Sequence, residues 1–384
     1  MNYRQQFPAL SNKAYFNYGG QGPMPQAALD AIVATYTQIQ SQGPFGLKTS
    51  DLVARESNLT RQTIATELGV TKDSIALTEN VTTGCNIALW GLNWQPGDRI
   101  LLSDCEHPGV IASINEICRR FQVTVDLFPL LATLNTGDPV AVVTAQLKPQ
   151  TRLVVLSHVL WNTGQVLPLA EIAAGIRQYK GGDRSIRILV DAAQSVGLLP
   201  LNLAKLGIDF YAFTGHKWWC GPEGVGGLYI HPDAFASLDS TFIGWRSLDY
   251  SQPGLPLVND ARRYEVATSA YPLYAGLRAA ITTHQAWGSG IERAGKIVSL
   301  ATYLWENLQQ VSEIKCLSDT APQSGLVSFQ VETGSHGKLV KDLEEQHFYL
   351  RTIVDPDCIR ACTHYFTTTA EIDELIQCLR KLTN

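Results

Sequence analysis

The order of apolar and polar positions divides the chain into two parts. In the first two thirds, short apolar runs rich in β-branched and aromatic residues alternate with segments whose apolar residues recur at helical spacing. The expected strands are Ile75–Leu77, Arg99–Ser103, Val123–Phe128, Leu153–Ser157, Ile186–Val190, Phe210–Thr214 and Gly227–Ile230. The expected helices are Pro25–Gln42, Asp51–Leu68 with a stop signal at Gly69, Gly84–Leu92, Gly109–Phe121 and Leu169–Lys180. This alternation predicts βαβ units and a mostly parallel buried sheet covered by helices.

The pattern changes after Gly254. The elements expected there are a long helical segment from about Tyr271 to Gln310, the alternating run Leu326–Val331, a helix near Gly337–Gln346, the run Ile359–Phe366 and the helix Ala370–Leu382. Such a mixture is typical of a smaller α+β domain on which the N-terminal stretch docks. We therefore expect a large α/β domain over residues 16–255 and a small domain made of residues 1–15 plus 256–384.

Composition narrows the function classes. The chain has 384 residues, of which 45% are hydrophobic, enough for two domains. Its net charge of -5 comes without a long basic run, so nucleic acid is not an expected partner. No signal-peptide pattern and no apolar stretch of roughly 18–20 residues occur, which predicts a cytoplasmic protein without a membrane partner. The eight cysteines include no CxxC pair, which favours reduced core thiols and no metal site.

One lysine stands where an imine-forming amine would be needed. Lys217 follows the apolar run Phe210–Phe213 in the sequence Phe-Thr-Gly-His-Lys, and a glycine-rich stretch from Gly221 to Gly227 comes next. Burial lowers the pKa of a lysine and leaves the neutral amine that condenses with a carbonyl group. A solvated lysine on a glycine-rich loop is the alternative.

A carboxylate and an amide follow a neighbouring apolar run. Asp191 ends the run Ile188-Leu-Val, which places a carboxylate at the carboxyl edge of the sheet, where ligands bind. There it can keep a heteroaromatic nitrogen protonated, and Gln194 can donate to a phenolic oxygen on the same ring. The alternative for Asp191 is a cap on a following helix.

Two further polar turns follow predicted strands. The turn from Thr78 opens an apolar helix, and its free backbone N–H groups with Thr82 and Thr83 suit a phosphate. An ordinary helix cap explains the same threonines. The imidazole of His107, in Glu-His-Pro, can stack on a flat ring or transfer protons. The alternative is a surface residue, which a lone loop histidine more often is.

Order and spacing of these elements resemble the class V aminotransferase family, the pyridoxal-phosphate (PLP) fold type I group that includes cysteine desulfurases. The resemblance implies a mostly parallel sheet of the seven-stranded type and PLP held by Lys217 as a Schiff base. The catalytic residues it implies are Lys217, His107 and Asp191. The cofactor-binding residues it implies are Thr82, Thr83, His107, Asp191, Gln194, Thr214, His216, Lys217 and Thr268.

Thr268 comes from the segment Tyr264-Glu-Val-Ala-Thr, which is similar to the family's Phe-Glu-x-Gly-Thr. The family threonine reaches the phosphate of the neighbouring subunit, so the resemblance implies a homodimer with shared active sites. Here Ala267 replaces the glycine, a mild departure from the family pattern.

The substrate side is expected to hold an amino acid. Its α-carboxylate needs an arginine clamp, and Arg360 matches the family's carboxylate-binding residue. Arg351 matches a second family arginine, and Asn162, in Trp-Asn-Thr-Gly, matches the substrate-side asparagine. A pair of surface arginines is the alternative.

The chemistry at sulfur separates the branches of the family. A cysteine desulfurase needs a mobile loop whose thiolate attacks the substrate, in an Arg-Gly-x-His-Cys setting that this sequence lacks. Only seven residues separate Thr352 from Arg360, and Cys358 falls in a tight Asp-Pro-Asp-Cys turn. The sequence looks like the cystine C–S lyase branch, which releases a persulfide by β-elimination. Because a persulfide is a good leaving group, this reaction needs no attacking cysteine. Pyruvate and ammonia would be the other products, and iron–sulfur acceptor proteins the recipients of the sulfur.

Three other interpretations stay open. A desulfurase using Cys358 or Cys362 would form alanine and a protein-bound persulfide. An epimerase or aminotransferase would return a racemised amino acid or an α-keto acid. A non-catalytic PLP-binding protein is disfavoured by the complete set Lys217, Asp191, His107 and Arg360.

Overall fold

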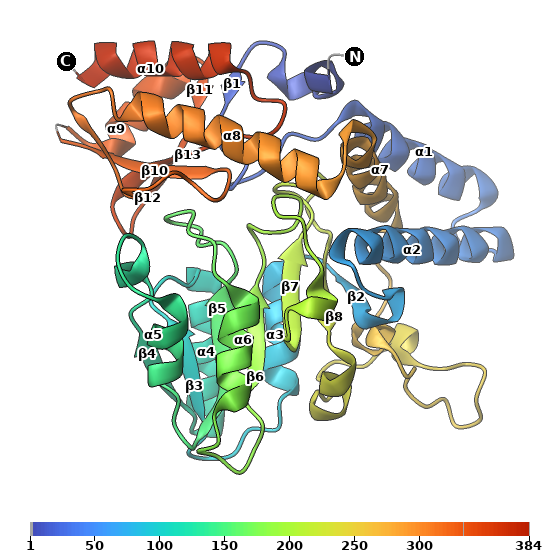
Figure 1. Cartoon of the computed structure of the whole chain (residues 1–384). Helices are drawn as coiled ribbons and strands as arrows, with labels where there is room; N and C mark the ends of the chain where they lie inside the picture. The colour runs from blue at the N-terminus through green and yellow to red at the C-terminus, as the bar shows by residue number, and fades with distance from the viewer. Residues whose placement is uncertain (1–2, 333, 384) are drawn as a thin grey trace.

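The main sheet of the computed structural model confirms the predicted mixed α/β architecture (Figure 1). The structure describes residues 3–332 and 334–383. Seven strands lie in the order β2-β8-β7-β6-β5-β3-β4; β8 runs antiparallel to both of its neighbours, and all other pairs are parallel. The strands are β2 (Ile75–Thr78), β3 (Arg99–Ser103), β4 (Thr124–Phe128), β5 (Thr151–Ser157), β6 (Arg187–Asp191), β7 (Phe210–Thr214) and β8 (Gly226–Ile230).

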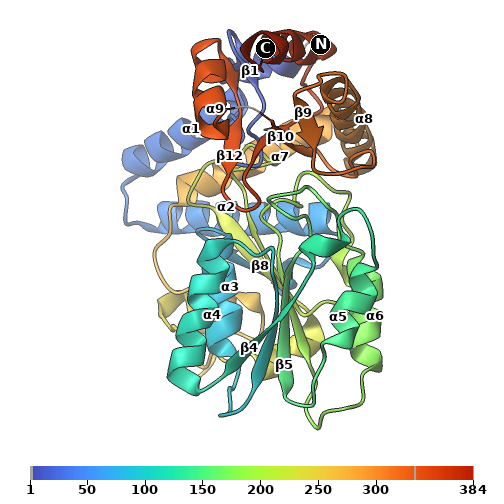
Figure 2. The ribbon, with the colours of Figure 1, turned by 90° about the vertical axis from the view of Figure 1, so that its left-hand side faces the viewer.

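Helices cover both faces of this sheet, which is why its central strands are apolar on both sides. Figure 2 shows α3 (Val81–Gly91) and α4 (Pro108–Phe121) on one face, with α5 (Pro139–Ala145) and α6 (Leu169–Gln178) on the other. Alternate residues of β5 belong to different cores: Leu153 and Val155 pack with α3 and α4, and Val154 and Leu156 pack with α5 and α6.

A second, smaller sheet lies above the first in Figure 1 and has the order β12-β13-β10-β9, all antiparallel. Its strands are β9 (Ile314–Cys316), β10 (Leu326–Val331), β12 (Arg351–Ile353) and β13 (Cys358–Cys362), with α9 (His336–Glu345) and α10 (Thr369–Thr383) packed beside them. The N-terminal strand β1 (Ala14–Tyr15) pairs with β11 (Phe348–Tyr349), so the N-terminal stretch does dock here. The exact division between the domains stays a prediction.

The expected long helix over 271–310 was wrong. It is two helices, α7 (Tyr271–Trp287) and α8 (Gly290–Leu308). Ser289 begins α8 with a capping box, because its backbone N–H donates to Glu292 Oε2 over 2.8 Å and its Oγ accepts from the Glu292 N–H. The two helices bury their apolar faces in different cores, that of the main sheet for α7 and that of the small sheet for α8.

Smaller differences also concern the ends of elements. The expected run Ile359–Phe366 is a strand only to Cys362. Helix α2 (Leu47–Leu68) starts earlier than expected, and it ends before Gly69, the predicted stop signal, which has the left-handed conformation with φ 66°. Together with α1 (Gln26–Gln42), it packs against α7. Among the described residues, no helix combines the length and apolarity needed to cross a membrane.

Candidate active site

The carboxyl ends of β6 and β7 meet the small sheet at the predicted site. Asp191 is the last residue of β6, is 5% exposed, and accepts a 2.9 Å hydrogen bond from the Ala193 N–H at Oδ1. Asp191 therefore stabilises a turn. Among the described residues, no helix begins directly after it, so it is not a helix cap. Burial raises the pKa of Asp191, and the nearby charges of Lys217 and His107 oppose that shift.

Lys217 lies three residues beyond the end of β7 and is partly buried. Desolvation lowers its pKa from 10.5 to about 8; Asp191 acts in the opposite direction, and Arg360 and Arg351 add to the lowering. Three charged groups, Asp191, Arg360 and Arg351, thus act on one amine. The environment is that of an amine that is easily deprotonated, unlike that of a solvated loop lysine.

The residues around Lys217 are tied together by short hydrogen bonds. Thr214 Oγ1 lies 2.7 Å from His216 Nδ1, and burial lowers the pKa of His216 to about 4, so its imidazole is neutral. Gln194 Nε2 donates to the Gly19 carbonyl oxygen, and its Oε1 accepts from Trp218 Nε1, each over 2.9 Å. One N–H of the Gln194 amide remains available.

His107 is the exposed N-cap of α4, and its Nδ1 accepts a 3.1 Å hydrogen bond from the Gly109 N–H. Partial desolvation and the charge of Lys217 lower its pKa. The ring is therefore neutral near pH 7 and carries its proton on Nε2. The Trp161 ring lies edge-on to it with centroids 5.6 Å apart.

The cap of α3 is an asparagine, and neither predicted threonine fills that position. Asn80 Oδ1 accepts from the N–H of Thr83 over 3.0 Å and from its hydroxyl over 3.3 Å. Thr82 is exposed beside His107: a Cβ built on Gly109 would lie 3.7 Å from Thr82 Oγ1 and 3.3 Å from His107 Nδ1. The start of α3 thus opens on the same side as His107.

The β12–β13 hairpin places the two predicted arginines opposite each other in register. Arg360 is 1% exposed; its Nη1 donates to the Trp161 carbonyl oxygen over 2.7 Å, but its Nε and Nη2 have no hydrogen-bond partner among the described residues. A buried cation with unused donors is costly. Arg360 is therefore suited to a bidentate carboxylate.

Asn162 lies beside this arginine, since it follows Trp161 directly. Its Nδ2 donates to the Asp355 carbonyl oxygen over 3.2 Å, while its buried Oδ1 has no partner among the described residues. Arg351 is exposed, but its charge reaches Lys217 and His107. The arginines are thus not an equivalent surface pair.

Together these residues fit the cofactor that the resemblance implies. A lysine with a lowered pKa, a buried carboxylate, a neutral imidazole and a helix N-terminus converge on one place. The unpartnered donors of Arg360 are available to hydrogen-bond an anionic substrate group.

Thr268 is the exception. It is exposed and lines a cavity of about 230 Å³ together with Thr83, Asn86 and Phe242. Among the described residues of this single chain, no hydrogen bond or ion pair joins Thr268 to Lys217 or its neighbours.

Sequence reasoning missed Glu106. Its buried carboxylate accepts from Ser103 Oγ at 2.5 Å, from the Ser157 N–H at 2.8 Å and from Ser157 Oγ at 2.8 Å, and so joins the ends of β3 and β5. Burial and the charge of Asp191 raise its pKa to about 7. Nothing in the local sequence indicated that this acidic residue, which directly precedes His107, would be buried.

The segment from Asn17 to Gly22 was also missed as part of the site. A Cβ on Gly19 would lie 2.9 Å from Arg360 Cζ, and the Gly22 N–H donates to the His216 carbonyl oxygen over 2.8 Å. The only sequence signal was the pair Gly19-Gly20, which permits such close approach.

All eight cysteines are unpaired, and burial raises the pKa of each thiol. Cys358 has no exposed surface and a pKa of about 12, at the end of a tight turn between β12 and β13. This is the opposite of the exposed, low-pKa thiol that a travelling nucleophile requires.

A model of the family described as aminotransferase class-V matches residues 14–375. Two solved structures of a protein called C-DES are each 52% identical to this chain. One is a complex of this cystine C–S lyase with its reaction product cysteine persulfide; it covers 98% of this chain and 99% of that chain, with a TM-score of 0.95. The other is a mutant with glycine covalently linked to the PLP cofactor, covering 98% of both chains with a TM-score of 0.96.

More distant relatives carry other names. Isopenicillin N epimerase of Streptomyces clavuligerus is 27% identical over 96% of this chain and 94% of its own. A probable cysteine desulfurase of Methanothermobacter thermautotrophicus is 25% identical over 99% of this chain and 97% of its own.

Proposed function

Because the chain belongs to the class-V aminotransferase family, we propose that it is a PLP-dependent carbon–sulfur lyase. It cleaves L-cystine, or cysteine, by β-elimination to pyruvate, ammonia and a persulfide or sulfide. The observation that carries this is the 52% identity to the cystine C–S lyase C-DES over 98% of the chain. PLP, when bound, supplies an electron sink for the negative charge that develops at the substrate Cα.

Lys217 holds the cofactor and, once released by the incoming amino acid, takes the Cα proton. A pKa of about 8 suits it to that transfer near neutral pH. Asp191 would keep the pyridine nitrogen protonated, His107 would stack on the ring, and Gln194 would offer its remaining N–H to the phenolic oxygen. The other residues that bind the cofactor are Thr82, Thr83, Thr214 and His216.

On the substrate side, Arg360 binds the α-carboxylate through its unused Nε and Nη2, and Asn162 offers its free Oδ1 nearby. The exposed Arg351 binds the second carboxylate of cystine. Loss of the Cα proton is followed by cleavage of the Cβ–S bond, whose electron pair leaves with the persulfide sulfur. The remaining fragment takes up water and decays to pyruvate and ammonia, so no oxidant or reductant is needed.

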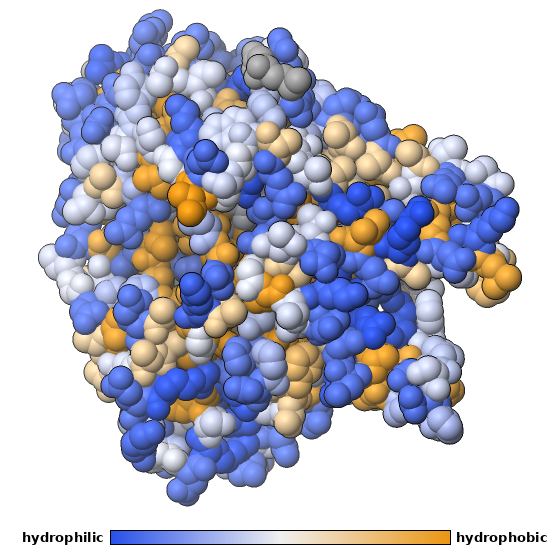
Figure 3. Space-filling view, turned by 45° about the vertical axis from the view of Figure 1, so that its right-hand side comes forward, coloured by the Kyte–Doolittle hydropathy of each residue, from blue (hydrophilic) through white to orange (hydrophobic). Residues whose placement is uncertain are grey.

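A homodimer with shared sites accounts for Thr268. Large apolar side chains are exposed in the segment that precedes it, including Phe242 at 71%, Ile243 at 58% and Trp245 at 50%. Figure 3 shows apolar patches on this side of the molecule, including its protruding end. If a second copy of the chain covers these apolar side chains, Thr268 of the first copy would bind the phosphate of the cofactor held by the second copy.

The released sulfur passes to iron–sulfur acceptor proteins in the cytoplasm. Eight unpaired cysteines support a reducing compartment.

A cysteine desulfurase is the second candidate, favoured by the relatives of that name. It would use Cys358 or Cys362 and form alanine. An epimerase, as the Streptomyces clavuligerus relative is named, would return the amino acid with inverted configuration.

One experiment separates these functions. Wild-type protein and Cys358→Ala, loaded with PLP, are incubated with cystine, and pyruvate, alanine and persulfide are measured. We expect pyruvate and persulfide from both proteins at equal rates. Alanine from the wild type alone would establish the desulfurase, and racemised substrate without pyruvate would establish the epimerase.

A further inference from the structure

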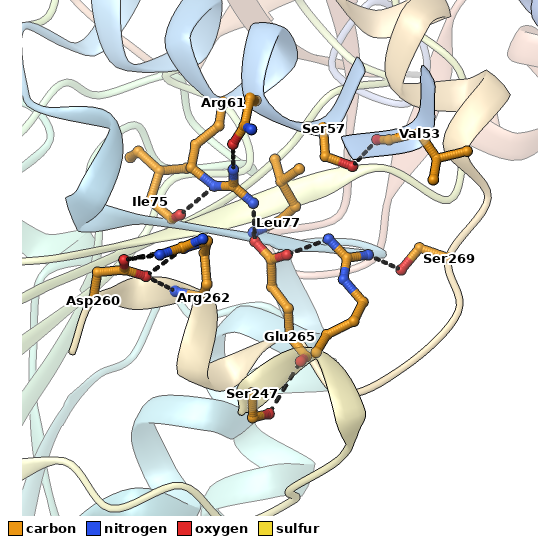
Figure 4. A network of polar contacts seen from close by, with 12 residues as sticks. Val53, Ser57, Arg61, Ile75, Leu77, Ser247, Asp260, Arg262, Glu265 and Ser269 are labelled. Atoms are coloured by element: carbon orange, nitrogen blue, oxygen red, sulfur yellow. Dashed lines mark hydrogen bonds and ion pairs between the residues drawn. The ribbon is translucent and has the colours of Figure 1, made fainter. Parts of the chain in front are cut away.

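An arginine bridges both ends of the loop that carries Thr268. Arg246 Nη2 donates to Glu265 Oε2 over 2.5 Å, and its Nη1 donates to Ser269 Oγ over 3.0 Å (Figure 4). The three residues between these contacts, Val266 to Thr268, are exposed. One guanidinium thus closes the base of a short exposed loop.

The first end of this loop is fixed to the main sheet. Glu265, 5% exposed, also accepts at Oε1 from the Leu77 N–H of β2 over 2.9 Å and from Arg61 Nη2 over 2.7 Å. Three charge-assisted hydrogen bonds to one buried carboxylate make a rigid anchor. Its backbone carbonyl accepts from Ser247 Oγ over 3.1 Å, which adds a further tie to the Arg246 segment.

The second end is held by Arg246 together with the start of α7. Arg246 Nη1 donates to Ser269 Oγ, the Tyr274 side chain hydrogen-bonds with both Ser269 and Arg246, and the Tyr271 N–H donates to the Ser269 carbonyl oxygen over 2.9 Å. Gly244 supports the same approach, because a Cβ there would lie 2.1 Å from the Val266 carbonyl oxygen. The guanidinium also lies over the Tyr271 ring, 5.5 Å from its centroid, which limits its orientation.

We propose that Arg246 is a positioning residue that holds the Val266–Thr268 loop in its binding conformation, so that Thr268 is ready for the cofactor phosphate of a neighbouring subunit. The inference rests on the role proposed above for Thr268. Its physical basis is preorganisation: a loop fixed before binding loses less conformational freedom when the phosphate arrives. Arg61, in contrast, also donates to Ile75 O and Asn58 Oδ1, and so joins α2 to the sheet irrespective of the loop.

Four variants test this proposal. Ser269→Ala removes the hydroxyl bonds to Arg246 and Tyr274 at the second end and keeps the buried ion pair, so it should fold. Arg246→Gln removes both contacts, and Thr268→Ala removes the phosphate ligand. Arg262→Gln is the control, since the side chain of that arginine pairs with Asp260 and, among the described residues, makes no hydrogen bond to residues 266–269.

Three quantities are measured for each: PLP affinity of the apo-protein, hydrogen exchange of the loop amides in the apo-protein, and dimer content by light scattering. Ser269→Ala and Arg246→Gln should speed exchange at residues 266–269 and weaken PLP binding about three- to tenfold. Thr268→Ala should weaken binding without speeding exchange. The Thr268→Ala, Ser269→Ala double variant should bind PLP no more weakly than Thr268→Ala, because a released loop costs nothing once its ligand is gone.

The outcomes separate this inference from the proposed function. Normal PLP affinity in Ser269→Ala and Arg246→Gln, with weak binding in Thr268→Ala, would overturn the role of Arg246 alone. Normal affinity in Thr268→Ala would overturn the phosphate role of Thr268 and the inference with it. The lyase function is judged independently by pyruvate formation from cystine in the wild type.

Discussion

The carboxyl ends of the central strands and the 241–269 segment differ in how complete they are within one chain. Around Lys217, Asp191 and Arg360, polar groups are buried, and the single chain supplies their neighbours from two sheets. In the 241–269 segment, Phe242, Trp245 and Thr268 are exposed beside a well-anchored loop. The first region has its charged groups assembled within one chain and lacks, by the role proposed for Thr268, only that threonine of a partner, whereas the second region exposes apolar side chains that a partner would cover. Catalysis and assembly should therefore respond to different substitutions.

The largest effect is expected from the first region. Lys217→Ala should lower pyruvate formation about 10³-fold or more, because both the attachment point and the proton acceptor are lost. The visible absorbance of the lysine-bound cofactor should disappear, while dimer content stays unchanged. The matched control is Lys205→Ala, an exposed lysine. Retained turnover in Lys217→Ala would contradict the assignment of the site.

The second region should determine assembly. Phe242→Ser removes a side chain that is 71% exposed in the single chain. If a symmetric dimer buries it twice, the dissociation constant should rise about 100-fold or more. Sedimentation at several protein concentrations measures this, with Leu382→Ser on α10 as the control. An unchanged constant would remove this segment from the interface.

The pH dependence sharpens the contrast further. The neutral Lys217 amine predominates only above its pKa of about 8, so PLP recombination with apo-protein should rise about tenfold per pH unit below 8 and then level off. From about pH 8 to 10.5 the unfolded chain holds this proton and the folded chain does not, so this group makes stability rise with pH. Arg360→Met should move the midpoint upward, since Arg360 lowers the lysine pKa. A rate that keeps rising tenfold per pH unit up to about pH 10 would exclude the lowered pKa.

The smallest effect concerns substrate choice. Arg351→Ala should reduce kcat/KM for cystine several-fold more than for a small β-substituted amino acid, because only cystine has a second carboxylate to lose an ion pair. Comparing the two substrates in the same variant cancels any general loss of activity. Equal losses would show that Arg351 does not read the distal carboxylate.

Sequence patterns predicted the main sheet well because its central strands are buried on both faces and form continuous apolar runs, although the edge strand β4 is partly exposed. They failed where structure depends on distant partners. The helix break at Ser289 follows from packing α7 and α8 into separate cores, and the three-residue strands β9 and β12 exist only through pairing with β10 and β13.

In the candidate site, too, residues placed by local sequence were predicted and residues placed by distant partners were missed. The local sequence was enough to predict that three residues lie close together, because each lies at or just after the end of a strand: Lys217, Asp191 and His107. Their roles stay predictions. Glu106 and Gly19 gave no such signal. Their place depends on Ser157 and Arg360, which lie 51 and 341 positions further along the chain.

Six of the eight thiols are buried and the other two are partly buried, which has a consequence for the chemistry of the proposed substrate. Cystine is a disulfide, and an exposed thiolate in the enzyme would exchange with it to give a mixed disulfide and an inactive protein. Here the pKa of each cysteine is raised by burial, and Cys358 and Cys362 next to the arginines have no exposed surface. The fold thus protects the thiols next to the arginines from exchange with the type of bond that the enzyme is proposed to cleave.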